Sequence, residues 1–243
     1  MIDICIQCHN YQRRLTWELS SILQQKNFDL SKLNINIACL KNNGNPTTED
    51  VVDLFKSNGL NIEYFYFDKE EFAKRGNVRN KQVSVTNSDW LFFADADHVY
   101  HYDFFNQLEK ELNRSRLYTS CNKVHTNSEF TYNIVNAFEY PNIINNAFEL
   151  SNSIPINENI KSRKVAAGCM QVVKRQDIIE RNNGLYVSHA IDKHLFKKGQ
   201  LARSDLLFRR EIKLKNRFLN LPLQIHLQHN RDKEVGYHLE EQR

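Results

Sequence analysis

Strands and helices alternate regularly along the first hundred residues, and this order constrains the fold more than any other feature of the sequence. Residues 2–6 have the alternating pattern of a strand, 15–23 repeat apolar side chains at helical spacing, and 35–40 are strand-like again. The alternation continues with a helix over 47–59, a strand over 62–67, a helix over 75–85 and an apolar strand over 90–94. Strands separated by helices pair in parallel, so we expect an α/β fold with a mostly parallel, doubly wound sheet flanked by helices.

The second half of the sequence gives weaker signals. Helices are expected over 104–112, 174–181 and 192–198, and strands over 117–121, over 165–173, near Ile212 and near Leu223. Residues 136–160 are rich in asparagine and show no period, so loops are expected there. These short elements predict a smaller sheet and loop region within the same single domain.

Composition excludes several classes of protein. Hydrophobic residues make up 41% of the 243 residues, with seven Gly and four Pro, which is typical of a packed chain and excludes a disordered or collagen-like one. The 33 Lys and Arg exceed the 29 Asp and Glu by four. This net charge and the pI of about 8.7 are too low to predict nucleic-acid binding, for which values above about 9 with clustered cations are usual.

The sequence also indicates a compartment. No apolar stretch approaches the roughly 20 residues that a membrane-spanning helix needs, so neither a transmembrane segment nor a signal peptide is expected. Five cysteines form no disulfide pattern, which favours a reducing compartment, and we predict a cytoplasmic protein. Cys5 and Cys8 form a single C-x-x-C inside a strand, for which packing is a simpler explanation than metal or redox chemistry.

Two carboxylates follow the apolar strand. Asp95 and Asp97 are two residues apart, so on an extended chain both point to the same side. Two neighbouring acids beside a core raise each other's pKa and destabilise the fold when nothing balances their charge. A divalent cation that binds both acids and also phosphate oxygens would balance that charge. Solvated loop acids, or an N-cap for the following helix, are the alternatives.

The motifs around these acids form a recognisable series. The polar turn Cys8-His9-Asn10 leads into a helix that contains Ser21-Ile22-Leu23-Gln24. Arg75-Gly76-Asn77-Val78-Arg79-Asn80 then precedes the strand that ends in Asp95-Ala96-Asp97. Over residues 2–105 this series resembles the GT-A-type nucleotide-sugar glycosyltransferases, above all the large family 2. The resemblance implies a GT-A-like fold and a nucleotide-sugar donor.

Candidate nucleotide contacts lie at the strand ends and on the helix before the acidic motif. They are His9, Asn10, Asn42, Asn43, Arg75, Arg79, Asn80, Asp95 and Ala96. Family 2 enzymes commonly have an Asp in the turn where this chain has Asn42 and Asn43. An amide can both donate and accept hydrogen bonds, so either Asn can still recognise the edge of a uracil base. Arg75 and Arg79 can steady the uridine or the diphosphate by charge-assisted bonds, and a solvated helix face is the alternative.

A second resemblance concerns residues 225–233. Their sequence, Ile-His-Leu-Gln-His-Asn-Arg-Asp-Lys, resembles the segment of the β-1,4-galactosyltransferase-like family 7 that returns a histidine to the metal. It implies that His229, and His226 three residues earlier, bind Mn²⁺ or Mg²⁺ together with Asp97. Asp95 would be a further metal residue that contacts the ribose or a water on the metal. Imidazole nitrogen suits Mn²⁺ in a mixed N/O site. Two ordinary surface histidines are the alternative.

An inverting transfer needs a general base for the acceptor hydroxyl. Asp192 is the candidate, because residues 182–199 resemble the family block in which a Gly-containing turn leads to Glu-Asp at a helix start. Ile191 stands where the Glu is usual. The alternative for Asp192 is an ordinary helix N-cap.

The late sequence also carries a basic run. It comprises Lys193, Lys197, Lys198, Arg203, Arg209, Arg210, Lys213, Lys215 and Arg217. Such a run can meet an anionic acceptor or lipid head groups at a membrane periphery, although a solvated face is the more common explanation.

Together, the resemblances imply a metal-dependent, inverting glycosyltransferase that transfers a sugar from a UDP-sugar to a glycan or lipid-linked glycan, as in bacterial surface polysaccharide synthesis. Residues 1–103 would bind the donor and 104–243 the acceptor. One rival is a non-catalytic sugar-nucleotide or glycan-binding protein on a degenerate copy of the fold, motivated by Ile191. A nucleotidyltransferase is a weaker rival, because residues 8–12 after the first strand lack the expected glycines.

Overall fold

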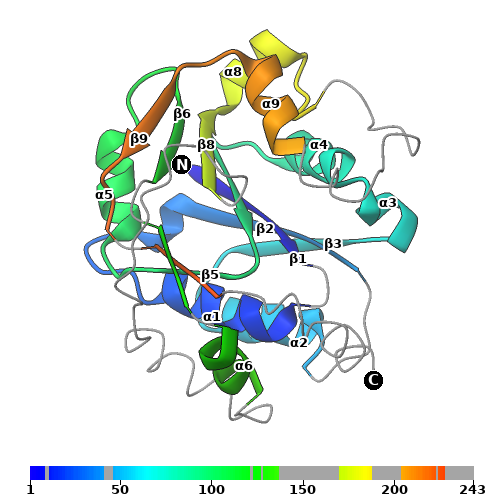
Figure 1. Ribbon diagram of the computed structural model, residues 1–243, viewed down its shortest axis with the longest axis vertical. Helices are drawn as coiled ribbons and strands as arrows, with labels where there is room; N and C mark the ends of the chain where they lie inside the picture. Colours follow the sequence, from blue (N-terminus) through cyan, green and yellow to red (C-terminus); the bar gives the residue numbers. More distant parts are fainter. Residues whose placement is uncertain are drawn as a thin grey trace.

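The computed structural model describes residues 1–8, 11–40, 46–120, 123–126, 128–136, 170–187, 204–222 and 224–227, which form an α/β fold around a seven-stranded sheet (Figure 1). Its strands are β1 (Ile2–Cys8), β2 (Leu33–Leu40), β3 (Ile62–Phe67), β4 (Trp90–Asp95), β6 (Leu117–Ser120), β8 (Met170–Lys174) and β9 (Asn216–Leu219). Their order is β3-β2-β1-β4-β8-β6-β9. The pairs among β3, β2, β1 and β4 are parallel, as is β6 with β9, whereas β8 is antiparallel to both neighbours.

Helices cover both faces of this sheet. They are α1 (Gln12–Leu23), α2 (Thr48–Ser57), α3 (Lys69–Ala73), α4 (Arg75–Val85), α5 (Phe104–Glu111), α6 (Ser128–Asn136), α8 (Arg175–Asn182) and α9 (Ser204–Ile212), with a 3₁₀ turn over Leu30–Lys32. Figure 1 shows α1 and α2 on one side of the sheet and α4, α8 and α9 on the other. None of the helices in the described ranges is long and apolar enough to cross a bilayer.

Alternate side chains of the central strands supply the two halves of the core. Ile4 and Phe92 pack with the apolar face of α1 and α2, whereas Cys5 and Phe93 pack with α4, α8 and α9 on the opposite face. All four side chains are fully buried. Burial on both faces explains why the 90–94 run is continuously apolar, and it confirms the predicted doubly wound arrangement.

The boundaries predicted for the first half are close to those observed. The strand over 62–67 and the helix over 75–85 have the predicted bounds. Thr47 and Asp50 form the expected capping box at the start of α2, and Gly59 follows that helix with a φ of +100°, which favours glycine. The free thiols of Cys5 and Cys8 are buried, in agreement with a packing role.

The second half departs more from the predictions. Ile212 ends helix α9 rather than lying in a strand, because residues 204–212 continue an amphipathic helix against the core. The predicted strand near Leu223 is observed as β10 (Gln224–His226). It belongs to a small second sheet with β5 (His98–Tyr100) and β7 (Lys123–His125). The predicted helix over 192–198 lies outside the described residues, as do the loops expected over 136–160 apart from Asn136, which ends helix α6.

Candidate active site

The small sheet carries a late segment of the chain to the acidic motif. Strand β4 ends at Asp95, residues 96 and 97 make a turn, and β5 begins at His98. Strand β10 pairs antiparallel with β5, and this register sets His226 opposite His98. The amide of Leu227 also donates to the carbonyl of Asp97 at 2.9 Å. Backbone bonds therefore hold His226 at the carboxyl end of the central strand.

Asp97 lies between two imidazoles. Its Oδ2 is 3.0 Å from Nε2 of His226, and its Oδ1 is 2.9 Å from Nδ1 of His98. The two rings are stacked, with centroids 4.8 Å apart and planes 12° from parallel. His98 is fully buried, whereas 18% of the His226 side chain is exposed, so the cluster opens toward solvent on the His226 side.

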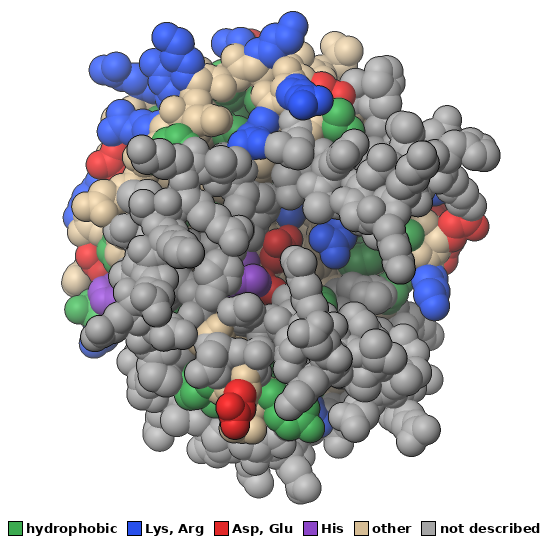
Figure 2. Space-filling model, in the orientation of Figure 1, with side chains coloured by type: hydrophobic (Ala, Val, Ile, Leu, Met, Phe, Trp, Pro, Cys, Tyr) green, Lys and Arg blue, Asp and Glu red, His purple; other side chains and the backbone are tan. Residues whose placement is uncertain are grey.

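This cluster has the composition of a metal site. One ligand atom from each of Asp97, His98 and His226 lies within 4.8 Å of the others. A carboxylate with two imidazoles is a mixed N/O donor set that suits a borderline divalent cation. Figure 2 shows a histidine beside acidic side chains near the middle of the displayed face. The donor set therefore fits the divalent cation that the sequence predicts.

Asp95 is placed differently from Asp97. Its Oδ1 lies 3.5 Å from Nη2 of Arg79, and 40% of its side chain is exposed. It is not a member of the cluster of Asp97, His98 and His226. Two acids at i and i+2 share a side only on an extended chain, and here the chain turns at the buried Ala96. Asp95 as a metal or ribose contact stays a prediction.

Arg79 is buried rather than solvated, which excludes the alternative of a solvated helix face. Its guanidinium donates to the carbonyls of Cys5 at 3.3 Å and of Ala94 at 3.4 Å. It also lies over the ring of Phe93, 5.1 Å from the centroid. With only 3% of its side chain exposed, Arg79 joins the middle of β1 to the end of β4 and forms an ion pair with Asp95. It makes these contacts from within the core.

Two other residues predicted to bind nucleotide lie on the same helix. Arg75 is exposed at the first position of α4, and its carbonyl accepts from Nε2 of Gln7 at 2.9 Å. The amide group of Asn80 bonds the backbone of Val187 in both directions, each at 3.0 Å. Asn80 therefore joins α4 to the segment after α8, while the Arg75 side chain is open to solvent. A nucleotide contact by either residue stays a prediction.

A buried acid lies behind the candidate metal cluster. Glu18 on α1 is fully buried, and its Oε1 accepts from the hydroxyl of Tyr100 at 3.2 Å. Burial raises the pKa of Glu18 well above its usual range; nearby His98 opposes the shift and Asp97 adds to it.

Sequence reasoning missed both His98 and Glu18. Glu18 occurs among Leu15, Leu19 and Ile22, on the face of α1 whose apolar spacing predicts burial. His98 directly follows the acidic motif. Both signals were present in the sequence. The predicted site residues His9, Asn10, Asn42, Asn43, Asp192 and His229 lie outside the described residues.

Comparison with known proteins identifies the class of domain. The model of the family described as glycosyl transferase family 2 matches residues 3–178, most of the chain. The chain belongs to glycosyl transferase family 2. The family match covers β1, α4 and the Asp95–Asp97 motif and ends before β10. The predicted family 7 likeness of 225–233, which includes His226, is therefore not addressed by it.

Solved structures support the GT-A fold of this family 2 domain. The chain is similar to S. aureus TarS 1-349, with a TM-score of 0.61, 10% identity and coverage of 98% of this chain and 62% of that one. It is also similar to the mannosyltransferase PcManGT from Pyrobaculum calidifontis, solved with GDP-Man and Mn²⁺, with a TM-score of 0.61, 11% identity and coverage of 97% and 59%. The chain thus spans less than two thirds of the length of these relatives. No curated protein sequence matches it.

Proposed function

We propose that this family 2 domain is a metal-dependent, inverting glycosyltransferase that moves a sugar from a UDP-sugar to a hydroxyl of a glycan or lipid-linked glycan acceptor. The observation that carries the proposal is the position of Asp97, held between His226 and His98 at the carboxyl end of the central strand. In open α/β sheets this edge is where ligands bind. With such an acceptor, the enzyme would act in the synthesis of a bacterial surface polysaccharide.

Asp97, His98 and His226 are the described residues that would hold the cation, and His229 is a further candidate from the sequence. When bound, a divalent cation supplies Lewis-acid stabilisation of the charge on the departing diphosphate, worth several kcal/mol. Two imidazoles beside one carboxylate favour Mn²⁺ over Mg²⁺, because Mg²⁺ prefers oxygen ligands.

The remaining roles are assigned to residues outside this cluster of three. Asp192 removes the proton of the acceptor hydroxyl as that oxygen attacks the anomeric carbon, which inverts its configuration. Arg75, exposed at the start of α4, binds the diphosphate, while Asn42 and Asn43 read the base. Asp95, oriented by Arg79 at 3.5 Å, contacts the ribose or a metal-bound water.

The ligands of the structural relatives support a nucleotide-sugar donor. TarS 1-349 was solved with UDP-GlcNAc, and that structure has a TM-score of 0.60 to this chain. PcManGT was solved with GDP-Man and Mn²⁺. One relative binds a uridine nucleotide and another a guanosine nucleotide. Whether this chain prefers UDP-sugars to GDP-sugars is therefore tested directly.

A thermal-shift panel of UDP- and GDP-sugars, with and without Mn²⁺, tests the donor and the cation together. We expect a UDP-sugar to raise the Tm only when Mn²⁺ is present, and slow donor hydrolysis to accompany it. Asp97→Asn should abolish both effects, whereas Asp53→Asn, an exposed acid on α2, should leave them unchanged. Metal-dependent binding without turnover under any acceptor would favour the non-catalytic binding protein instead.

A further inference from the structure

Three segments far apart in the sequence place their cations at one end of the molecule, here called the basic end. They are residues 110–116, 174–181 and 209–217. Together they hold eleven Lys and Arg against four Asp and Glu, a net charge of +7, whereas the whole chain carries +4. The rest of the chain is therefore net negative, and the positive charge is concentrated at this end. Figure 2 shows these blue side chains gathered over α8, α9 and β9.

Strand register brings the three segments together. Leu117 of β6 pairs with Asn216 of β9 in parallel, so the residues before them, Arg116 and Lys215, are neighbours across the strands. Strand β8 runs antiparallel to β6 and ends at Lys174 on the same side. The amide of Leu117 also donates to the carbonyl of Lys215 at 3.2 Å. The cations are therefore clustered by the sheet itself.

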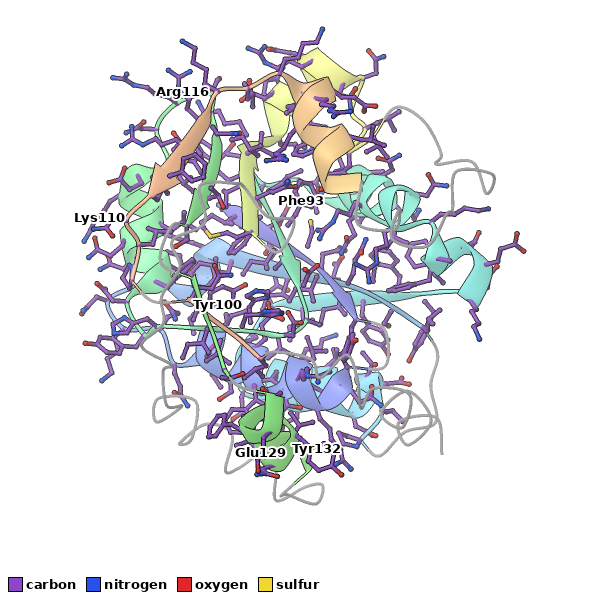
Figure 3. The ribbon with its side chains drawn as sticks, in the orientation of Figure 1. Phe93, Tyr100, Lys110, Arg116, Glu129 and Tyr132 are labelled. Carbon is purple, nitrogen blue, oxygen red and sulfur yellow. The ribbon has the colours of Figure 1, made fainter. Side chains whose placement is uncertain are left out.

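Most of these cations face solvent. The exposed members are Lys110, Arg114, Arg181, Arg210, Lys213, Lys215 and Arg217. Two of them form ion pairs, Arg217 with Glu111 at 2.6 Å and Arg181 with Asp177 at 3.2 Å. Figure 3 shows Lys110 and Arg116 projecting outward from this side of the molecule. A large excess of positive charge is therefore available to an anionic surface.

The basic end also carries apolar side chains and a recess. Phe218 on β9 and Ile179 on α8 are 39% and 38% exposed. A polar recess of about 420 Å³ opens between residues 87–90, 112–113 and 174–176, and Lys174 and Arg175 contribute to its wall. A phospholipid surface offers phosphate head groups to the cations and acyl chains to the exposed apolar side chains. A soluble polyanion would bind the cations but has no apolar layer for Phe218 and Ile179.

We propose that the basic end docks the protein on an anionic phospholipid surface. Each Lys or Arg near such a surface contributes on the order of 1 kcal/mol, so several exposed cations are sufficient for reversible binding at moderate salt. Lys174 and Arg175 contact phosphate head groups, and Phe218 and Ile179 contact the upper acyl region. The proposal rests on surface charge and register and is independent of the transfer activity.

Co-sedimentation of the full chain with vesicles tests the docking. Vesicles of phosphatidylglycerol mixed with phosphatidylcholine are compared with pure phosphatidylcholine, at low salt and at 0.5 M NaCl. We expect binding to the anionic vesicles only, and its loss at high salt because counterions screen the attraction. Arg114→Glu/Arg210→Glu/Lys215→Glu should lower the vesicle partition coefficient on the order of 100-fold.

A control variant with the same change in net charge tests whether vesicle binding depends on where the cations lie. Lys56→Glu/Lys69→Glu/Lys81→Glu makes the same charge change at exposed positions of α2, α3 and α4 and should bind anionic vesicles within about threefold of the unaltered protein. Thermal melts establish that both variants fold. Absence of vesicle binding, equal binding to neutral vesicles, an equal loss in both variants, or binding to soluble polyphosphate but not to vesicles would overturn the proposal.

Discussion

Asp97 is the residue on which the candidate site depends, because both of its oxygens face imidazole nitrogens within 3.0 Å. A carboxylate that is 7% exposed and surrounded in this way has little access to bulk water. Such a group is stable when its charge is balanced by a cation or by protonated histidines. The site is therefore sensitive to the loss of either histidine.

We predict that His226→Ala and His98→Ala each weaken Mn²⁺ binding at least about tenfold, because each removes one donor from a small cluster. Isothermal titration with Mn²⁺ measures the effect. His101→Ala, three residues beyond His98 and outside the cluster, is the matched control and should bind as the unaltered chain does. Unchanged affinity in His226→Ala would remove this residue from the metal site.

Glu18 makes folding stability depend on pH in a defined direction. Burial raises its pKa in the folded state, so the folded chain binds more protons than the unfolded chain, and stability falls as pH rises above the usual Glu value. Glu18→Gln removes this titration while keeping an acceptor for Tyr100. We therefore expect the Tm of Glu18→Gln, relative to the unaltered protein, to increase between pH 5 and pH 8.

Glu63→Gln, at an exposed position of β3, provides the control for this pH series and should show no such increase. Parallel Tm curves for Glu18→Gln and the unaltered protein would show that Glu18 ionises normally when buried.

Local patterns predicted the elements of the first half because each strand and helix there has its own period and end signals. Helix α2, for example, begins at a capping box and is followed by Gly59. Strand β5 could not be predicted in this way. It has three residues, and it pairs with β10 across more than a hundred residues of sequence, so no local period reveals β5 or this pairing.

The candidate site was therefore predictable only in part. The acidic motif and His226 were identified from the sequence, and the structure brings them together. The separation of Asp95 from Asp97 depends on a turn at 96–97, which the two-residue spacing does not encode. The burial of Arg79 depends on rings from β4 and from Tyr186, after α8, which meet only in the folded chain.

Helix α4 packs closely against the segment after α8 at Gly76, and this close contact predicts the effect of a substitution there. A Cβ on Gly76 would lie 2.5 Å from Cγ2 of Val187, whose branched side chain has little freedom to move. Gly76→Ala should therefore destabilise the protein by about 1–3 kcal/mol despite the better helix propensity of alanine. Urea unfolding measures the change.

Val187→Ala in the Gly76→Ala background should restore part of that loss, because it removes the methyl groups that collide. Additive losses in the double variant would show that Gly76 is required for another reason.

The Asp97 cluster and the basic end lie at different edges of the molecule. The Asp97 cluster lies at the carboxyl ends of the parallel strands, while the basic end is built from the starts of β6 and β9 and the end of β8. A site at one edge of the sheet and a charged surface at another would allow the proposed donor chemistry and the proposed membrane docking to operate independently. Variants of the basic end should therefore leave nucleotide binding unchanged.

The most direct test of the metal site is an electron paramagnetic resonance titration of Mn²⁺, with and without UDP, for the unaltered protein and for Asp97→Asn. We predict one Mn²⁺ per chain, tighter binding when UDP is present because nucleotide and cation share the site, and at least about tenfold weaker binding in Asp97→Asn with loss of the UDP effect. Equal Mn²⁺ affinity in the two proteins, with the same response to UDP, would contradict a cation held by Asp97.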